Sequence, residues 1–195
     1  HDRSRGRHPA SAGSRVVSAA PTGNEFPGAR NLEIMGEARN YNAFLLSLVT
    51  ARAPDDARLL DFGAGSGTIS KGVAQQAGPR GQSLVCVEPD PALRRQLSEA
   101  GLAALPSPAE LGTRSVDFAY SLNVLEHIED DLAAARSLFE VLRPGGRLLL
   151  YVPAFMVLFS AMDTQVGHVR RYRRGELADV CTQAGFRVES SSYVD

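Results

Sequence analysis

A glycine-rich run, DFGAGSG over residues 61–67, has the clearest potential for ligand binding in this sequence. It follows a short apolar segment and opens a helical pattern, so it is expected to connect a strand to a helix. Glycines permit a sharp turn and the close approach of a ligand, and the free amide groups of the next helix favour a carboxylate. We therefore expect Gly63, Gly65 and Gly67 to bind a cofactor that carries a carboxylate.

Two acidic residues at strand ends refine the choice of cofactor. Asp61 precedes the first glycine by two residues, where its charge would repel a pyrophosphate and suit ammonium and sulfonium groups. Glu88 lies about 20 residues after the loop, where a carboxylate accepts hydrogen bonds from ribose hydroxyls. The G-x-G-x-G spacing also differs from the G-x-G-x-x-G of dinucleotide binders. The pattern favours S-adenosylmethionine over NAD, although Glu88 suits the ribose of either.

Strand-like and helical segments alternate along the chain and would position these residues. We expect strands at 58–62, 83–88, 102–105, 116–121, 147–152 and 186–193. We expect helices at 37–53, 68–76, 90–100, 130–142 and 175–184. Apolar strands separated by helices predict a parallel sheet covered on both faces, in a three-layer, doubly wound α/β fold.

Composition divides the chain into a tail and one domain. Residues 1–30 are rich in Arg, Ser, Gly, Ala and Pro, so we expect a disordered or loosely ordered tail, and no apolar segment of an export signal follows. Residues 31–195 are expected to form the domain. A net charge of -1 argues against nucleic acid as a partner, and no apolar run approaches the ~20 residues of a membrane span. With Cys86 and Cys181 read as reduced thiols, a cytoplasmic protein is expected.

Five segments in order resemble the class I S-adenosylmethionine-dependent methyltransferases, in particular the methyltransferase type 11 group. They are LLDFGAGSGTIS, VCVEPD, SVDFAYSLNVLEHIEDD, LRPGGRLLLYVPA and GHVRRYRRGEL. The resemblance implies that Asp61 and the three glycines surround the methionine moiety of the cofactor. It also implies that Glu88 holds the ribose, Ser107 flanks the adenine, and Asn123 faces the methionine end and the substrate.

The function that the resemblance implies is methyl transfer to a small-molecule acceptor by in-line substitution. The protein would contribute mainly by aligning the acceptor atom with the methyl group. The family's sheet has seven strands, and the seventh is missing from this sequence. An exposed sheet edge would favour a homodimer. Two alternatives stay open: a module that binds S-adenosylmethionine without catalysis, and an NAD-linked oxidoreductase.

Two histidines are candidates for a catalytic base. His127 follows the fourth strand, at the edge where open α/β sheets place ligands, although a role with Glu126 in orienting the loop is the preferred interpretation. His168 lies after the fifth strand and is the second candidate. Asp130 and Asp131 are interpreted as the first residues of the next helix. No metal site is predicted, although a divalent metal near this region stays an open alternative.

The segment after the fifth strand is predicted to contact the acceptor. Four of the five residues 170–174 are arginines, and arginine forms bidentate bonds with carboxylates and phosphates. We predict that Arg170, Arg171 and Tyr172 bind substrate as part of a lid, against the alternative of a solvated basic loop. The apolar run 153–162 lines an acceptor pocket or belongs to the core. The resemblance adds a preference for sugar, polyketide or lipid acceptors.

Overall fold

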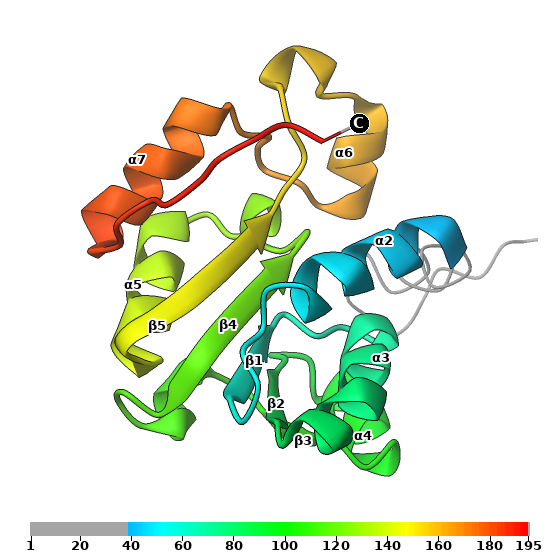
Figure 1. Ribbon diagram of the computed structural model, residues 1–195. Helices are drawn as coiled ribbons and strands as arrows, with labels where there is room; N and C mark the ends of the chain where they lie inside the picture. Colours follow the sequence, from blue (N-terminus) through cyan, green and yellow to red (C-terminus); the bar gives the residue numbers. More distant parts are fainter. Residues whose placement is uncertain (1–38, 195) are drawn as a thin grey trace, which may run out of the picture.

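The computed structural model describes residues 39–194, which fold into a five-stranded parallel sheet with helices on both faces (Figure 1). The strand order is β3-β2-β1-β4-β5, from strands β1 (Arg58–Phe62), β2 (Ser83–Val87), β3 (Ala103–Leu105), β4 (Val116–Leu122) and β5 (Leu142–Tyr151). The helices are α2 (Arg39–Thr50), α3 (Thr68–Ala77), α4 (Pro91–Glu99), α5 (Asp131–Val141), α6 (Ala161–Val166) and α7 (Arg174–Ala184). The predicted α/β fold is confirmed, whereas the tail predicted for residues 1–30 lies outside the described residues.

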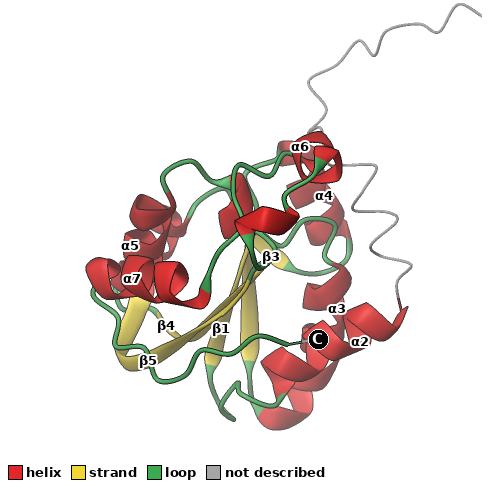
Figure 2. Cartoon of the chain, turned by 90° about the horizontal axis from the view of Figure 1, so that it is seen from above, coloured by secondary structure: helices red, strands yellow, loops and turns green. Residues whose placement is uncertain are grey.

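The alternation of side chains along the strands explains the three layers. Leu59 of β1 packs on one face of the sheet with residues of α2 and α3, because successive strand side chains point to opposite faces. Leu60 packs on the other face with Leu138 of α5. Figure 2 shows the strands between α5 and α7 on one side and α2 and α3 on the other. Within residues 39–194, no helix is long and apolar enough to cross a membrane.

Strand β5 begins earlier than the sequence predicts. The sequence predicts a helix to residue 142 and a strand only from 147, but Leu142 already pairs with Val116, and the register with β4 then shifts before Phe118. Gly145 adopts a φ of 82°, a left-handed conformation that glycine reaches at little cost. The glycine pair therefore allows an irregularity inside the strand where the sequence suggests a break.

The sixth strand predicted at 186–193 is wrong. Figure 1 shows this segment crossing beside α7 toward α6, and it belongs to no strand. The amide of Phe186 completes the end of α7, and the ring of Tyr193 stacks on Phe155 at 4.5 Å between centroids. The Tyr193 hydroxyl accepts the Arg174 amide hydrogen at 3.0 Å. These contacts hold the segment over the last helices, so its extended backbone forms no ladder with β5.

Candidate active site

The glycine loop, residues 63–67, follows β1 and fits tightly against β2 and β4. Gly63, Gly65 and Gly67 have φ angles of 80°, 55° and 78°, all left-handed. The Gly63 amide donates to the Val87 carbonyl at 2.8 Å. A Cβ atom on Gly63 would lie 2.5 Å from Cγ2 of Val124, so the site requires glycine on steric grounds as well. The tight turn predicted from the glycines is therefore present, and cofactor binding by the loop stays a prediction.

Glu88 connects the end of β2 to the glycine loop. One carboxylate oxygen accepts the Gly65 amide hydrogen at 2.8 Å, and the other accepts that of Asp90 at 2.9 Å. Burial raises the pKa of Glu88, and these two backbone hydrogen bonds oppose the shift. A carboxylate has about four lone-pair positions, so Glu88 keeps capacity for hydroxyl donors such as those of a ribose.

Asp61 is a buried carboxylate at the end of β1. It is 4% exposed, and the Ser70 hydroxyl donates to its Oδ2 at 2.6 Å. Burial raises the pKa of Asp61 to about 6, although the Ser70 hydrogen bond lowers it. Asp61 is therefore mostly ionised at neutral pH, and its charge next to the glycine loop favours a cationic group.

Ser107 lies in the turn after β3, beside the Glu88 backbone. The Glu88 amide donates to the Leu105 carbonyl at 2.9 Å, which brings this turn to the edge of the glycine-loop site. Ser107 is half-buried and precedes the short helical turn Pro108–Leu111. Its predicted contact with adenine stays a prediction.

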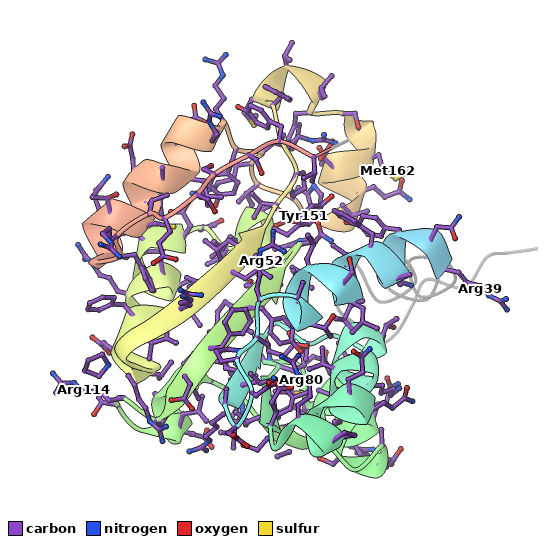
Figure 3. The ribbon with its side chains drawn as sticks, viewed as in Figure 1. Arg39, Arg52, Arg80, Arg114, Tyr151 and Met162 are labelled. Atoms are coloured by element: carbon purple, nitrogen blue, oxygen red, sulfur yellow. The ribbon has the colours of Figure 1, made fainter. Side chains whose placement is uncertain are left out.

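Asn123 follows β4 and joins it to α2. Its φ of 56° is left-handed, its amide donates to the Tyr151 carbonyl at 2.8 Å, and its Nδ2 donates to the Tyr41 hydroxyl at 2.9 Å. The rings of Tyr41 and Tyr151 lie 6.2 Å apart, and Figure 3 shows Tyr151 where β5 approaches α2. Neither tyrosine is predicted as a site residue from the sequence, because helical periodicity places Tyr41 on an apolar face without indicating its partner.

His127 and His168 lie side by side, although 40 residues separate them in the sequence, with ring centroids 4.7 Å apart. Nδ1 of His127 lies 3.2 Å from the Gly167 carbonyl oxygen, and Nδ1 of His168 lies 2.7 Å from Oδ1 of Asp163. Because both partners are acceptors, each Nδ1 is assigned as the donor. Burial, with His168 nearby, lowers the pKa of His127 and favours its neutral form.

Asp163 is the centre of the contacts around His168. It is 1% exposed, and Arg171 donates to both of its oxygens, through Nε at 2.7 Å and Nη2 at 3.0 Å. The Arg171 hydrogen bonds hold the pKa of Asp163 well below its usual range. The amide of Ser160 also donates to Asp163, at 2.8 Å, as in a capping box. The Ser-x-x-Asp spacing is the local signal by which Asp163 could have been found.

Arg170 and Tyr172 also bind within the protein. Arg170 lies 2.6 Å from Oδ2 of Asp131 and donates to the Glu129 carbonyl, and the buried Tyr172 hydroxyl donates to the same Asp131 oxygen at 2.8 Å. Asp130 accepts the Ala133 amide hydrogen, in agreement with its predicted capping role. Substrate binding by Arg170, Arg171 and Tyr172 stays a prediction, and an acceptor would have to share their side chains with these carboxylates.

The strand order and the residues that follow β1 and β2 define a Rossmann-like fold of the class I methyltransferase type. A glycine loop follows β1 and a buried carboxylate follows β2, as the sequence predicts. The chain belongs to the methyltransferase-domain family, which matches residues 35–191. The family resemblance drawn from the sequence is therefore confirmed, and the assignment gives no support to an NAD-linked oxidoreductase.

Similar proteins agree with this assignment. A probable S-adenosylmethionine-dependent methyltransferase of Mycolicibacterium smegmatis is 33% identical over 100 residues, which cover 50% of this chain and 37% of that protein. An S-adenosylmethionine-dependent methyltransferase from Thermotoga maritima has a similar fold, with a TM-score of 0.65 and 21% identity over 83% of this chain and 80% of that one. Phosphoethanolamine N-methyltransferase 2 of Haemonchus contortus, solved with S-adenosylmethionine, gives a TM-score of 0.59 at 20% identity, over 75% of this chain and 36% of that one. The chain thus spans 37% of the length of the first of these relatives.

Proposed function

We propose that the glycine loop binds S-adenosylmethionine and that the chain takes part in transferring its methyl group to a small-molecule acceptor. The observation that carries the proposal is the pair of hydrogen bonds from Gly65 and Asp90 to Glu88. They hold a carboxylate suited to ribose hydroxyls beside the glycine loop, in a chain of the methyltransferase-domain family. The proposal concerns this chain, which covers only part of the relative from Mycolicibacterium smegmatis.

The residues around the loop fit the parts of this cofactor. Asp61 supplies negative charge for the ammonium and sulfonium groups, and Glu88 supplies acceptors for the ribose. Ser107, in the turn after β3, would flank the adenine, and Asn123, after β4, would face the methionine end. When bound, the cofactor supplies an activated methyl group on a positively charged sulfur. The task of the protein is then to align the acceptor with this methyl group and to exclude water.

An acceptor that loses a proton on methylation needs a base, and the histidine pair is our candidate. The loops that carry His127 and His168 follow β4 and β5, at the edge where ligands bind in open α/β sheets. Asp163 holds Nδ1 of His168, which would leave Nε2 to take the proton. A positioned base of this kind contributes about 10²–10⁴-fold to a rate.

The acceptor is proposed to be apolar or amphiphilic. Large apolar side chains are exposed along the segment after β5, and they are Phe155, Met156, Val157, Leu158 and Met162. This group favours a lipid-like acceptor, and the nearby arginines would add a preference for an anionic or sugar-phosphate group if they exchange their present partners. A cytoplasmic location, a homodimer and the absence of a nucleic-acid partner stay predictions.

Calorimetric titration with S-adenosylmethionine, S-adenosylhomocysteine and NAD tests the cofactor. We expect binding of the first two and none of NAD, with a strong loss of affinity in Glu88→Ala and a smaller one in Glu88→Gln. Glu99→Ala, which removes an exposed carboxylate on α4, is the matched control and should bind as the unchanged chain does. Binding of NAD alone, or equal binding by Glu88→Ala and the control, would overturn the proposal.

Turnover separates an enzyme from a module that only binds the cofactor. The measurement is release of S-adenosylhomocysteine with labelled methyl groups, over a panel of lipid-like, sugar and phosphorylated acceptors. Transfer above the background without acceptor supports the enzyme. Binding without transfer to any of these acceptor classes favours the non-catalytic module.

A further inference from the structure

Glu126 combines complete burial with a lack of hydrogen bonds. It is 0% exposed, and neither carboxylate oxygen has a hydrogen-bond partner among the described residues. Buried polar groups are nearly always paired, because an unpaired one loses its interactions with water without compensation. A carboxyl group in either protonation state has lone pairs to satisfy, so Glu126 needs a partner.

Both neighbouring histidines are held in the manner of metal ligands. His127 uses Nδ1 toward the Gly167 carbonyl, and His168 uses Nδ1 toward the Asp163 carboxylate. A metal-bound histidine typically donates its other ring N–H to a backbone carbonyl or a carboxylate, which fixes the tautomer and the ring orientation. Coordination would then use the Nε2 atoms, and Nε2 of His168 lies 3.9 Å from Oε1 of Glu126.

The distances and charges of this group suit one cation. One ligand atom from each of Glu126, His127 and His168 lies within 4.8 Å of the other two. Bonds of about 2.0–2.2 Å to a common ion bring such atoms within roughly 4.4 Å of each other, so small side-chain rotations would complete the site. Arg171 already pairs with Asp163, so a cation bound at Glu126 would supply the positive charge that an ionised Glu126 lacks.

We propose that Glu126, His127 and His168 form a binding site for a divalent first-row transition-metal ion. One carboxylate oxygen and two imidazole nitrogens suit Zn²⁺, Mn²⁺ or Fe²⁺ and leave coordination positions open. The side chain of Val124, two residues before Glu126, lies where a Cβ on Gly63 would be, so the site adjoins the glycine loop.

Metal binding stands independently of the proposed function, and only its use in methyl transfer rests on that function. A cation would occupy the nitrogen lone pairs that a general base needs, so it replaces the base role of these histidines. A hydroxyl group of the acceptor bound at an open position would lose its proton more readily, because a metal ion lowers the pKa of bound oxygen ligands.

The test is Co²⁺ titration of the full chain, prepared without an affinity tag and stripped with a chelator. We expect one equivalent of Co²⁺ with a visible absorption band, and displacement of the band by Zn²⁺. Glu126→Gln and His168→Gln should abolish the band. Asp163→Asn should weaken binding by about 10–100-fold, the usual effect of losing a residue that orients a ligand.

Two controls separate this site from adventitious binding. Glu129→Gln makes the same charge change on an exposed residue three positions away and should bind Co²⁺ normally. Replacement of His1 and His8 by Ala should also leave the band unchanged. The proposal would be overturned by any of three results. They are loss of the band when His1 and His8 are replaced, absence of Co²⁺ binding by the unchanged chain, and a band that survives both Glu126→Gln and His168→Gln.

Circular dichroism on each variant checks that it folds. If Glu126→Gln does not fold, the result for His168→Gln decides the test. Titration with S-adenosylmethionine in the presence of chelator distinguishes the two proposals. Cofactor binding without Co²⁺ binding overturns only the metal site. Co²⁺ binding without cofactor binding supports the metal site and overturns only the proposed cofactor site.

Discussion

The glycine loop and the group around His168 hold their carboxylates in opposite ways. Glu88 accepts two backbone N–H groups, so its position depends on the path of the chain. Asp163 accepts the Ser160 amide hydrogen, but most of its hydrogen bonds come from the side chains of Arg171 and His168, so its position depends mainly on side chains that fold back onto it. The first region should therefore be sensitive to any added Cβ atom, and the second to the loss of a single side-chain partner.

The largest effect is expected at Asp163. Asp163→Ala would leave the Arg171 guanidinium, whose side chain is 23% exposed, without its bidentate partner. Removing one partner of a buried ion pair costs about 3–5 kcal/mol, because the other charge stays desolvated. Urea unfolding should show this decrease in the free energy of unfolding. Asp179→Ala, an exposed carboxylate on α7, is the control and should change it little. If Asp163→Ala and Asp179→Ala decreased the free energy of unfolding equally, the proposed dependence of this region on single side-chain partners would be wrong.

The second test adds a methyl group to the glycine loop. Gly63→Ala would set a Cβ against Val124 and force a φ of 80° on alanine, which costs about 1–3 kcal/mol for overpacking and about 1–2 kcal/mol for the backbone. Thermal unfolding and cofactor titration should both report a loss. Gly78→Ala is the matched control, because its φ is -56° and no heavy atom lies within 4 Å of the added Cβ.

A double variant separates the two causes. Combining Gly63→Ala with Val124→Ala removes the steric contact but keeps the strained φ angle, so stability should recover only in part. Full additivity of the two single effects would show that the close contact contributes nothing.

The same contrast explains what could be predicted from the sequence. The roles of Gly63, Gly65 and Glu88 depend on local features: a strand end, a tight turn and a fixed spacing to the next strand. Those features are visible in the order of residues, and the structure places these residues together as expected. The five paired strands follow for the same reason, since their apolar runs need cover on both faces.

The second region depends on side-chain pairings that local patterns do not specify, apart from the Ser-x-x-Asp spacing at Asp163. His127 and His168 could be singled out by residue type, but the pairing of Asp163 with Arg171 could not. The arginines at 170 and 171 suggest an open basic surface, whereas both fold inward onto carboxylates. The predicted strand at 186–193 fails for a related reason, because an extended pattern does not specify which hydrogen-bond partners the segment will find.

The third prediction concerns pH, for which the two regions differ in sign. The pKa of Asp61 is raised to about 6, above its unfolded value of about 3.9, so its contribution to stability is full below about pH 4. The contribution of Asp61 to the free energy of unfolding decreases as the pH rises from about 4 through 6, by up to about 1.4 kcal/mol per pH unit. Relative to Asp61→Asn, the unchanged chain should therefore lose stability in urea unfolding between pH 4 and pH 6.

The pKa of Asp163 is lowered, so its contribution is present above the unfolded value and is lost only as the pH falls below about 4. Asp179→Asn, which removes an exposed carboxylate on α7, is the control. A difference between Asp61→Asn and the unchanged chain that stays constant from pH 4 to pH 7 would contradict the raised pKa of Asp61.

The smallest effect is expected where α2 meets the end of β4. Tyr41→Phe removes the hydroxyl that accepts from Nδ2 of Asn123 while it keeps the ring beside Tyr151. The loss of one partly buried hydrogen bond costs about 0.5–1.5 kcal/mol, so the midpoint of urea unfolding should shift slightly without a change in slope.

If Asn123 faces the cofactor, its released side chain should also weaken S-adenosylmethionine binding. Asn123→Ala should then add little when combined with Tyr41→Phe, because the two changes break the same bond. Fully additive losses would instead mean that Asn123 acts independently of the helix.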